Sequence, residues 1–390
     1  MAVYKLSEIC TKIGSGATPR GGKESYSEKG ISLIRSQNVL DYKFSYDGLA
    51  HITEEQAEKL NNVEVRSNDV LLNITGDSVA RACKVVSSVL PARVNQHVAI
   101  VRANEDVALS SYILYYLQLS KKNLLLLASG GATRNALTKE MIENLQISIP
   151  SIERQEKIVA IIDNLQDKIE LNNRINENLQ QQSFALFEQL LSQSEGDLCK
   201  LSEIAELNPK RQLAKGVVAR CIDMAQLSTS GTFPNGWEMK PYNGGMRFSN
   251  GDTIIARITP CLENGKTAFI DFLDNSEVAF GSTEYIILSS KGVYPAEFFY
   301  CLARYPAFVD YAVKNMNGSS GRQRVSADTL GKYLLPRISE EEICLFRDTM
   351  TPMFKAMRNN SLENMRLSVI RDTLLPKLMS GELDVSDIDL

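Results

Sequence analysis

The sequence predicts an α+β fold in which two similar globular α/β domains are separated by two long antiparallel helices that form a coiled coil, with pseudo-two-fold symmetry and a nearly circular chain course. Three observations predict it. The pentapeptide KLSEI stands at 5–9 and again at 200–204 of the 390 residues. The strand and helix patterns that follow it recur in the same order. Two long helical patterns then match each other position by position.

The two globular domains are predicted at 1–150 and 195–338, because both carry the same succession of apolar runs bounded by turn residues, which is typical of β-strands. The corresponding runs are SNDVLLNITG (67–76) and SNGDTIIARITP (249–260), then HVAIVRA (97–103) and TEYIILS (283–289). An aromatic-rich amphipathic helix pattern follows in each half. A glycine-rich segment with basic residues comes next, ASGGATRNALT in one half and NGSSGRQRVS in the other.

Two long helices are predicted, a central one at 151–194 and a C-terminal one, with its tail, at 339–390. Apolar residues and Asn repeat there with the 4-3 spacing of a coiled-coil seam. The seam of the first helix is Ile158, Ile162, Leu165, Ile169, Asn172, Asn176, Leu179, Leu186 and Leu190, and that of the second, 188 residues later throughout, is Phe346, Met350, Met353, Met357, Asn360, Asn364, Leu367, Leu374 and Leu378. A long isolated helix would leave its apolar stripe in water, so we expect the two stripes to pair.

Polar residues and a proline interrupt these helices. Asn172 and Asn360 fall at interface-type positions, where a buried Asn can fix the register of a coiled coil; the alternative is that both are solvated. Pro352 stands where the first helix has Asn164, and a proline removes a helix hydrogen bond, so we expect the second helix to be bent or split there.

The order of domain and helix along the chain requires the two helices to be antiparallel. The C-terminal GELDVSDIDL followed by the N-terminal MAVYKLSEI would mimic the internal SEGDLCKLSEI. We therefore expect the two termini to lie close together.

Composition excludes several classes of protein. No run reaches the roughly 18 apolar residues that a membrane span needs, and the first residues lack the pattern of a signal peptide, so we expect a cytoplasmic protein with no membrane partner. The seven cysteines are dispersed and His51 and His97 are the only histidines, which predicts no disulfide framework, no metal site and no cofactor. The net charge of −4 does not indicate a freestanding nucleic-acid binder, but it does not exclude one.

The most suggestive catalytic motif is Gly265–Lys266–Thr267, which resembles the end of a phosphate-binding loop. The first glycine of that motif would fall at 260, where the sequence has Pro260. The glycine-rich GSGATPRGG at 14–22 lacks the context of a dinucleotide fold. We therefore predict no catalytic residues, and a nucleotide-dependent enzyme stays a rival interpretation.

Both halves carry polar loops with Arg, Lys, Asn and Gln beside glycines. In the major groove Arg pairs with guanine and Asn or Gln with adenine, while hydroxyls and loop amides suit phosphates. The alternative is that these loops are ordinary polar turns. The loops lie at 18–23, 34–38, 73–77, 93–97 and 130–135 in the first half, and at 208–212, 256–266, 281–284 and 318–324 in the second.

The residues resemble a known family, the specificity (S) subunits of Type I restriction–modification systems. FSNGDTIIARITPCLENGKTAF, GSTEYIIL and MNGSSGRQRVS are similar to one variety of its target-recognition domain, and LSEICTKIGSGATPRGG is similar to its usual domain opening. SIERQEKIVAIID resembles the start of the family's central helix, and LLPKLMSGELDV resembles the end of its C-terminal helix. The resemblance spans nearly the whole chain.

This resemblance implies a subunit without catalysis of its own that reads an interrupted site on double-stranded DNA, one part with each domain. It also implies that the paired helices set the gap and dock two methyltransferase subunits, which restriction subunits join. Two alternatives stay open: a scaffold whose two globular heads bind protein, and the same adaptor in a methylation-only system.

The DNA-contacting residues that we predict combine the resemblance with the loop chemistry. In the first domain they are Arg20, Lys23, Arg35, Gln37, Asn38, Arg134 and Asn135, and in the second they are Lys210, Arg211, Arg257, Thr259, Asn264, Lys266, Arg322, Gln323 and Arg324.

Overall fold

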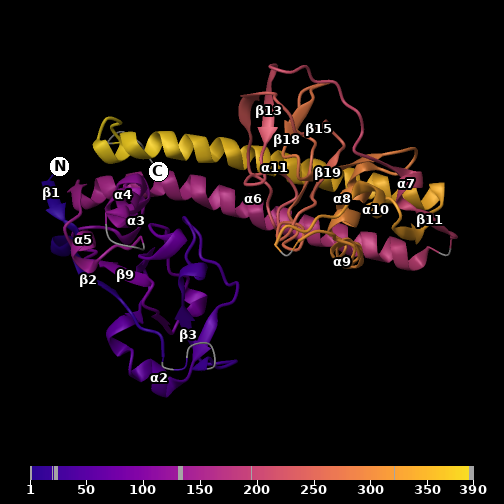
Figure 1. The fold of residues 1–390 in the computed structure, drawn as a ribbon. Helices are drawn as coiled ribbons and strands as arrows, with labels where there is room; N and C mark the ends of the chain where they lie inside the picture. Colours follow the sequence, from indigo (N-terminus) through magenta and orange to yellow (C-terminus); the bar gives the residue numbers. More distant parts are fainter. Residues whose placement is uncertain are drawn as a thin grey trace. The chain divides into compact units, whose positions relative to one another are not determined.

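The computed structural model describes residues 2–19, 21, 25–130, 135–194, 196–319 and 321–385. The chain forms two compact units (Figure 1). Unit 1 comprises 1–167 and 368–390, and unit 2 comprises 168–367. Each of the two long helices therefore contributes residues to both units.

The described strands of unit 1 form three small sheets. Their strands are β1 (Ala2–Lys5), β2 (Cys10–Ser15), β3 (Ile31–Ile34), β4 (Ala50–Ile52), β5 (Glu64–Val65), β6 (Val70–Asn73), β7 (Ala82–Lys84), β8 (Ala92–Val94), β9 (Val98–Ala103) and β10 (Gln146–Ile149). The strand orders are β1-β10, β2-β9-β6-β7 and β4-β3-β8-β5, with β3 and β8 parallel. The helices are α1 (Leu6–Ile9), α2 (Glu54–Glu58), α3 (Ser110–Leu119), α4 (Lys121–Ser129) and α5 (Lys139–Glu143).

Unit 2 repeats this topology strand for strand. Its strands are β11 (Leu198–Lys200), β12 (Ala205–Leu207), β13 (Val218–Ile222), β14 (Glu238–Pro241), β15 (Met246–Phe248), β16 (Thr253–Ala256), β17 (Thr267–Phe269), β18 (Ala279–Gly281), β19 (Tyr285–Ser290) and β20 (Leu334–Pro336). The orders β11-β20, β12-β19-β16-β17 and β14-β13-β18-β15 are those of unit 1 with ten added to each strand number, and β13 and β18 are again parallel. The helices are α7 (Leu201–Ile204), α8 (Ala296–Arg304), α9 (Pro306–Lys314) and α10 (Ala327–Leu330).

The repeated pentapeptide forms the same short helix in both units, α1 and α7. The Glu8 carboxylate accepts a hydrogen bond from the backbone N–H of Lys5, and Glu203 does the same for Lys200. Both Leu and both Ile of the two copies are buried. The pentapeptide therefore recurs because it caps one turn of helix and anchors it in each core.

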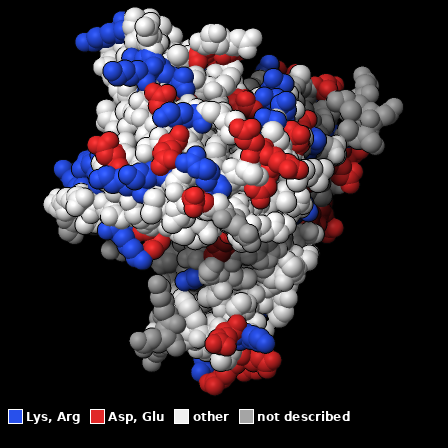
Figure 2. Space-filling model, turned by 90° about the vertical axis from the view of Figure 1, so that its right-hand side faces the viewer, with Lys and Arg blue, Asp and Glu red and all other residues white. Residues whose placement is uncertain are grey.

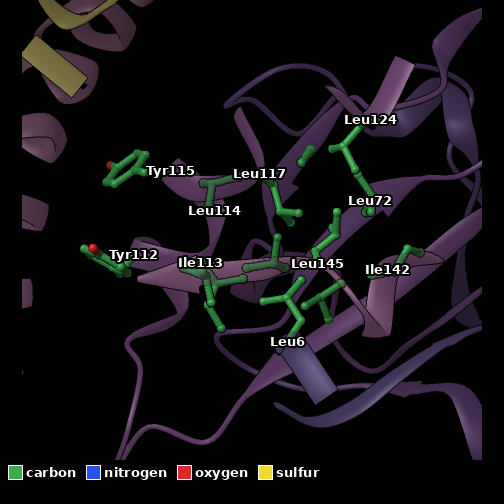
Figure 3. Close-up of a cluster of buried hydrophobic side chains, with 14 of the residues drawn as sticks. Leu6, Leu72, Tyr112, Ile113, Leu114, Tyr115, Leu117, Leu124, Ile142 and Leu145 are labelled. Atoms are coloured by element: carbon green, nitrogen blue, oxygen red, sulfur yellow. The ribbon is translucent and has the colours of Figure 1, made fainter. Parts of the chain in front are cut away.

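The core of unit 1 lies between the sheet β2-β9-β6-β7 and helix α3. Leu6, Leu72 and Leu145 come from distant parts of the chain and meet there (Figure 3). Burying each such side chain contributes on the order of 1.5–3 kcal/mol. At the edge of this cluster the Tyr112 hydroxyl donates to the Ser148 carbonyl at 3.0 Å, and that of Tyr115 donates to the Asp163 carboxylate of the long helix α6 (Ile152–Gln193).

The core of unit 2 is dominated by aromatic rings. Phe187 of helix α6 packs edge-to-face on Phe298 with ring centroids 5.0 Å apart. Phe354 of the second long helix, α11 (Glu340–Ser380), packs on Phe269 at 5.2 Å. Edge-to-face pairs add stability beyond the area that they bury. Phe354 lies beside the predicted seam residue Met353, and it is Phe354 that is fully buried against the domain.

The long helices are α6 (Ile152–Gln193) and α11 (Glu340–Ser380), and α11 is continuous through Pro352, so the expected split is wrong. They run antiparallel in each unit (Figure 1). In unit 1, Gln166 accepts from Arg371 at 2.9 Å, while Arg154 donates to the Leu383 carbonyl, just beyond α11. The fold class predicted from the sequence, repeated α/β domains with a pair of long antiparallel helices, is confirmed.

The seam residues are distributed between the helix pair and the domain cores. Ile158 and Ile162 share the unit 1 core cluster with Leu378, and Phe346, Met350 and Met357 lie in that of unit 2. Ile169 and Asn172 are also buried, whereas Leu165, Leu179, Met353, Asn360 and Leu367 are partly exposed.

A cluster of asparagines joins α6 to α11 inside unit 2. The amide of Asn172 donates to Asn364 Oδ1 at 2.9 Å and to Glu363 at 2.8 Å, and Asn360 donates to Asn176 Oδ1 at 2.9 Å. Adding 188 to a position in α6 exchanges these two Asn–Asn contacts, so the helix pairing has the symmetry of the repeat. Because Asn172 is fully buried and hydrogen-bonded, we reject the alternative that it is solvated.

Among the described residues, no helix is long and apolar enough to cross a membrane.

Candidate nucleic-acid interface

Three loop segments meet in unit 2 where strand β16 ends and β19 begins, and we call residues 257–259, 284 and 322–325 junction 2. The backbone N–H of Arg257 donates to the Glu284 carbonyl at 3.0 Å, and that of Thr259 donates to the Gln323 carbonyl at 3.0 Å. The N–H of Val325 donates back to the Arg257 carbonyl at 3.0 Å. The polar loops predicted at 256–266, 281–284 and 318–324 therefore form one site.

Junction 2 carries a charged cluster. The Arg324 guanidinium donates to the Glu284 carboxylate through Nε at 2.9 and 3.0 Å and through Nη2 at 2.7 Å. This hydrogen bonding is the main reason that the pKa of Glu284 is lowered and that of Arg324 is raised. Arg257 also lowers the pKa of Glu284, and its Nε is buried without a hydrogen-bond partner.

Unit 1 contains the same backbone arrangement, which we call junction 1: residues 74–76, 97 and 135–137. The N–H of Ile74 donates to the His97 carbonyl at 3.0 Å and that of Gly76 to the Asn135 carbonyl at 3.1 Å. The N–H of Leu137 donates to the Ile74 carbonyl at 2.8 Å. These three hydrogen bonds correspond one by one to those of junction 2.

The side chains at the two junctions differ although the backbones match. Where junction 2 has Glu284 and Arg324, junction 1 has His97 and Ala136. The Thr75 hydroxyl lies 2.6 Å from His97 Nδ1, and Gln96 Nε2 lies 3.2 Å from His97 Nε2. One frame therefore presents an Arg–Glu ion pair in unit 2 and a Thr–His–Gln set in unit 1.

Several predicted residues lie in or beside junction 2 within reach of a ligand. Asn264 and Arg322 are exposed, and Thr259 and Gln323 are partly exposed. The Thr259 hydroxyl accepts from the Gln323 backbone N–H at 3.1 Å. Lys210 is exposed in unit 2, and Asn135 is exposed in junction 1.

The run that resembles a phosphate-binding loop is engaged within unit 2. Lys266 Nζ donates to the Met224 carbonyl at 2.7 Å, and Thr267 begins strand β17 with its side chain buried. Arg304 donates to the Gly265 carbonyl. Lys266 and Arg304 therefore both donate to backbone carbonyls of unit 2.

Arg211 lies in a buried ion pair rather than on an open surface. Its Nε and Nη2 donate to the Asp252 carboxylate at 2.8 and 2.6 Å, and Asp252 is 0% exposed. In unit 1 the corresponding aspartate, Asp69, is also buried, and its partner comes from a different element: Arg102 of β9 donates to it at 2.7 and 2.8 Å. We assign Arg211 to the stability of unit 2 and leave it out of the DNA-contacting set.

Three predicted residues of the first domain organise a loop. Asn38 is 0% exposed, and its amide donates to the carbonyls of Ser45 and Asp47 at 3.0 and 3.1 Å. Gln37 donates to the Asp47 carbonyl at 2.9 Å, and Arg35 donates to that of Gly48. Because Asn38 is fully enclosed, we also leave it out, whereas Gln37 is exposed and Arg35 partly exposed.

Three further predicted residues, Arg20, Lys23 and Arg134, lie outside the described residues.

The sequence does not single out Glu284, His97 or Thr75 as site residues. Each lies inside one of the predicted polar loops, but no local pattern distinguishes it from its neighbours. The repeat is the signal that could have identified His97 and Glu284, because His97 directly precedes β9 and Glu284 directly precedes the corresponding strand β19.

On the face drawn in Figure 2, lysine and arginine side chains lie among aspartates and glutamates. In the part of the chain that the structure describes, no group of three or more His, Cys, Asp or Glu side chains could hold a metal ion.

Residues 1–181 match the family model of the Type I restriction modification DNA specificity domain. The chain is 26% identical to the Type I restriction enzyme MjaIX specificity subunit of Methanocaldococcus jannaschii, over 99% of this chain and 94% of that protein. It is 23% identical to the HindI specificity subunit of Haemophilus influenzae, over 90% of this chain and 94% of that one. The crystal structure of the Type I restriction–modification S subunit from M. genitalium has the same fold, with a TM-score of 0.58 at 15% identity over 99% of this chain and 96% of that chain.

Proposed function

The chain belongs to the family of Type I restriction–modification specificity subunits, and on that premise we propose that units 1 and 2 each read one part of an interrupted site on double-stranded DNA. Helices α6 and α11 fix the gap between the two parts and dock two methyltransferase subunits, which restriction subunits join. The subunit supplies recognition, and its partners supply the chemistry.

The observation that carries this proposal is the pair of junctions. Two units with the same backbone frame and different side chains are suited to bind one kind of ligand while reading different features of it. DNA is such a ligand, since its backbone repeats while its base edges vary. The Thr–His–Gln set around His97 and the Arg–Glu pair around Arg324 would then select different bases.

Exposed apolar side chains support the docking of two similar partners. Val3 in β1 and Leu198 in β11 occupy equivalent positions of the repeat and are 63% and 66% exposed. In unit 2, Leu171 and Ile175 are also exposed, one helical turn apart on α6. Of these residues Val3 and Leu198 recur in the repeat, and an apolar group at both positions fits two similar protein partners better than it fits DNA.

The length of the helices suits a spacer. At about 1.5 Å per residue, the 42 residues of α6 extend roughly 60 Å, whereas one turn of B-DNA is about 34 Å. The asparagine contacts of Asn172 with Asn364 and of Asn176 with Asn360 fix the register of the helix pair.

Long-read detection of methylated bases in the host genome, with and without the gene for this chain, tests the proposal. We expect one interrupted motif to lose its methylation on deletion and to regain it on complementation. Persistence of every methylated motif would contradict the proposal and favour a protein-binding scaffold.

Two further measurements separate the remaining alternatives. Restriction of unmethylated phage DNA that carries the motif distinguishes a complete restriction system from a methylation-only one. Binding of ATP by the purified chain alone would favour the nucleotide-dependent enzyme.

A further inference from the structure

Contacts inside junction 2 leave a defined part of the Arg324 guanidinium available. A guanidinium has five N–H groups in one plane. Nε and Nη2 donate to Glu284, and Nη1 donates to the Arg322 carbonyl at 3.0 Å. These contacts use one N–H on each nitrogen, so one N–H on Nη1 and one on Nη2 are left.

Both residues of the pair can be reached from outside. The side chain of Arg324 is 39% exposed and that of Glu284 is 26% exposed. The ion pair holds the long Arg side chain in one orientation before any ligand binds. A donor that is already ordered loses less conformational entropy on binding than a free Arg would lose.

Guanine is the base that this arrangement fits. Its major-groove edge presents two neighbouring acceptors, O6 and N7, which accept two N–H groups of one guanidinium. Adenine presents one acceptor beside a donor, and the donor would face an N–H of Arg324. Cytosine presents a donor, and thymine presents one acceptor beside a methyl group.

Junction 1 provides an internal comparison. Its positions equivalent to Glu284 and Arg324 are His97 and Ala136, so unit 1 has no Arg–Glu pair at this place in the frame. If the frame itself set the base preference, both units would share it. We therefore expect any difference in base preference between the two units to come from the side chains at the junctions.

We propose that Arg324 reads a guanine through O6 and N7 in the part of the DNA site that unit 2 contacts, and that Glu284 is the positioning residue that orients it. This inference rests on the proposed function and adds the identity of one base and of the group that reads it.

The test uses the full chain assembled with its methyltransferase subunits, and the probe is a library of DNA duplexes with randomised bases from which bound molecules are sequenced. We expect the wild-type complex to select an interrupted motif with a guanine in the part read by unit 2. R324A should lower the preference for that guanine by roughly 5-fold to 150-fold, the discrimination typical of one bidentate contact. All other positions should keep their preferences.

Two further variants at the same pair separate base reading from charge and folding. R324K keeps the charge without the planar fork. Because a lysine can also donate to O6 and N7, R324K should keep total binding and show a guanine preference between those of wild type and R324A. E284Q should weaken the preference at that one position, because the carboxylate that orients Arg324 is gone. A structural role alone would lower all positions together.

Two arginine controls complete the design. R337A removes the ion pair between Arg337, which directly follows β20, and Glu203 of α7. This variant should leave every base preference unchanged. R322A removes an exposed neighbour of Arg324 and should weaken binding at all sequences alike, as expected of a phosphate contact.

Retention of the full guanine preference in both R324A and R324K, with a wild-type complex that selects an interrupted motif, would overturn the inference and leave the proposed function standing. A wild-type complex that selects no interrupted motif would overturn both.

Discussion

Replacing Arg211 with Ala tests whether this residue belongs to the stability of unit 2 rather than to DNA contact. The substitution removes both guanidinium hydrogen bonds from Asp252, which is fully buried. The carboxylate keeps the Ser249 backbone N–H at 2.7 Å and the Ser289 hydroxyl at 2.7 Å. Breaking a buried ion pair on one side costs about 3–5 kcal/mol. Because Arg211 is itself 23% exposed, we expect the lower end, about 3 kcal/mol.

The assay follows the fluorescence of Trp237 during urea unfolding. Trp237 is the only tryptophan of the chain and stacks on Phe272 in unit 2 at 5.0 Å, so it reports on the unit that contains the pair. With an m-value of roughly 2 kcal/mol per molar urea, the expected loss lowers the midpoint by about 1.5 M. The double variant R211A/D252N should be hardly less stable than D252N alone, since both changes remove one interaction.

The matched control is R337A, whose partner Glu203 is exposed and whose loss should leave the midpoint unchanged. A midpoint for R211A equal to that of R337A would refute the assignment. So would an R211A complex that folds normally but changes one base of the selected DNA motif.

Three further predictions concern the core, the junction and the spacer. M350A should lower the unfolding free energy of unit 2 by about 2–5 kcal/mol because Met350 is fully buried. L345A, at a position 71% exposed, should change it by less than about 0.5 kcal/mol. Equal effects of the two variants in the same urea assay would contradict the assigned burial. Arg324 lowers the pKa of Glu284 below its ordinary value of 4.5, so their pairing stabilises the fold above pH 4.5 and is lost as the pH falls through the lowered value. The difference in urea-unfolding midpoint between wild type and R324A should therefore stay constant from pH 7 to 5 and vanish in acid. A difference that grows in acid would refute the pairing. Inserting four residues into α6 after Asp167 and four into α11 after Leu367 should change the tolerated gap and keep the bases of both half-sites, as read by sequencing methylated sites; changed half-site bases would count against the spacer.

The position of this insertion was chosen from the tertiary structure and not from the seam residues that the sequence predicts. Leu179, a natural choice from the sequence, packs against the core of unit 2, and the next residue, Gln180, donates to Thr232 and Tyr300 at 2.9 and 2.8 Å. An insertion at Leu179 would move these groups out of the core. Asp167 and Leu367 are instead the residues at which the two units divide each helix.

The sequence by itself determined the repeat, the strand succession and the two long helices. These features are encoded locally, since a strand or helix shows its periodicity within one run of residues, and a repeat only adds a second copy at a fixed offset. The pentapeptide KLSEI is the simplest case, because its capping Glu and two anchors lie within one turn of helix.

Only the tertiary structure decided what each polar side chain does. Arg211 and Arg324 look alike in the sequence, both in polar loops of the second domain. Arg211 meets Asp252 and Arg324 meets Glu284, 41 and 40 residues away, and the difference is that Asp252 is sealed in the core whereas Glu284 lies at the surface. The role of Asn38 likewise depends on the tertiary structure, because its loop folds back and places two backbone carbonyls where the Asn38 amide donates to them. The fate of such a group depends on which distant partner neutralises its charge or satisfies its hydrogen bonds, and folding alone brings that partner into contact.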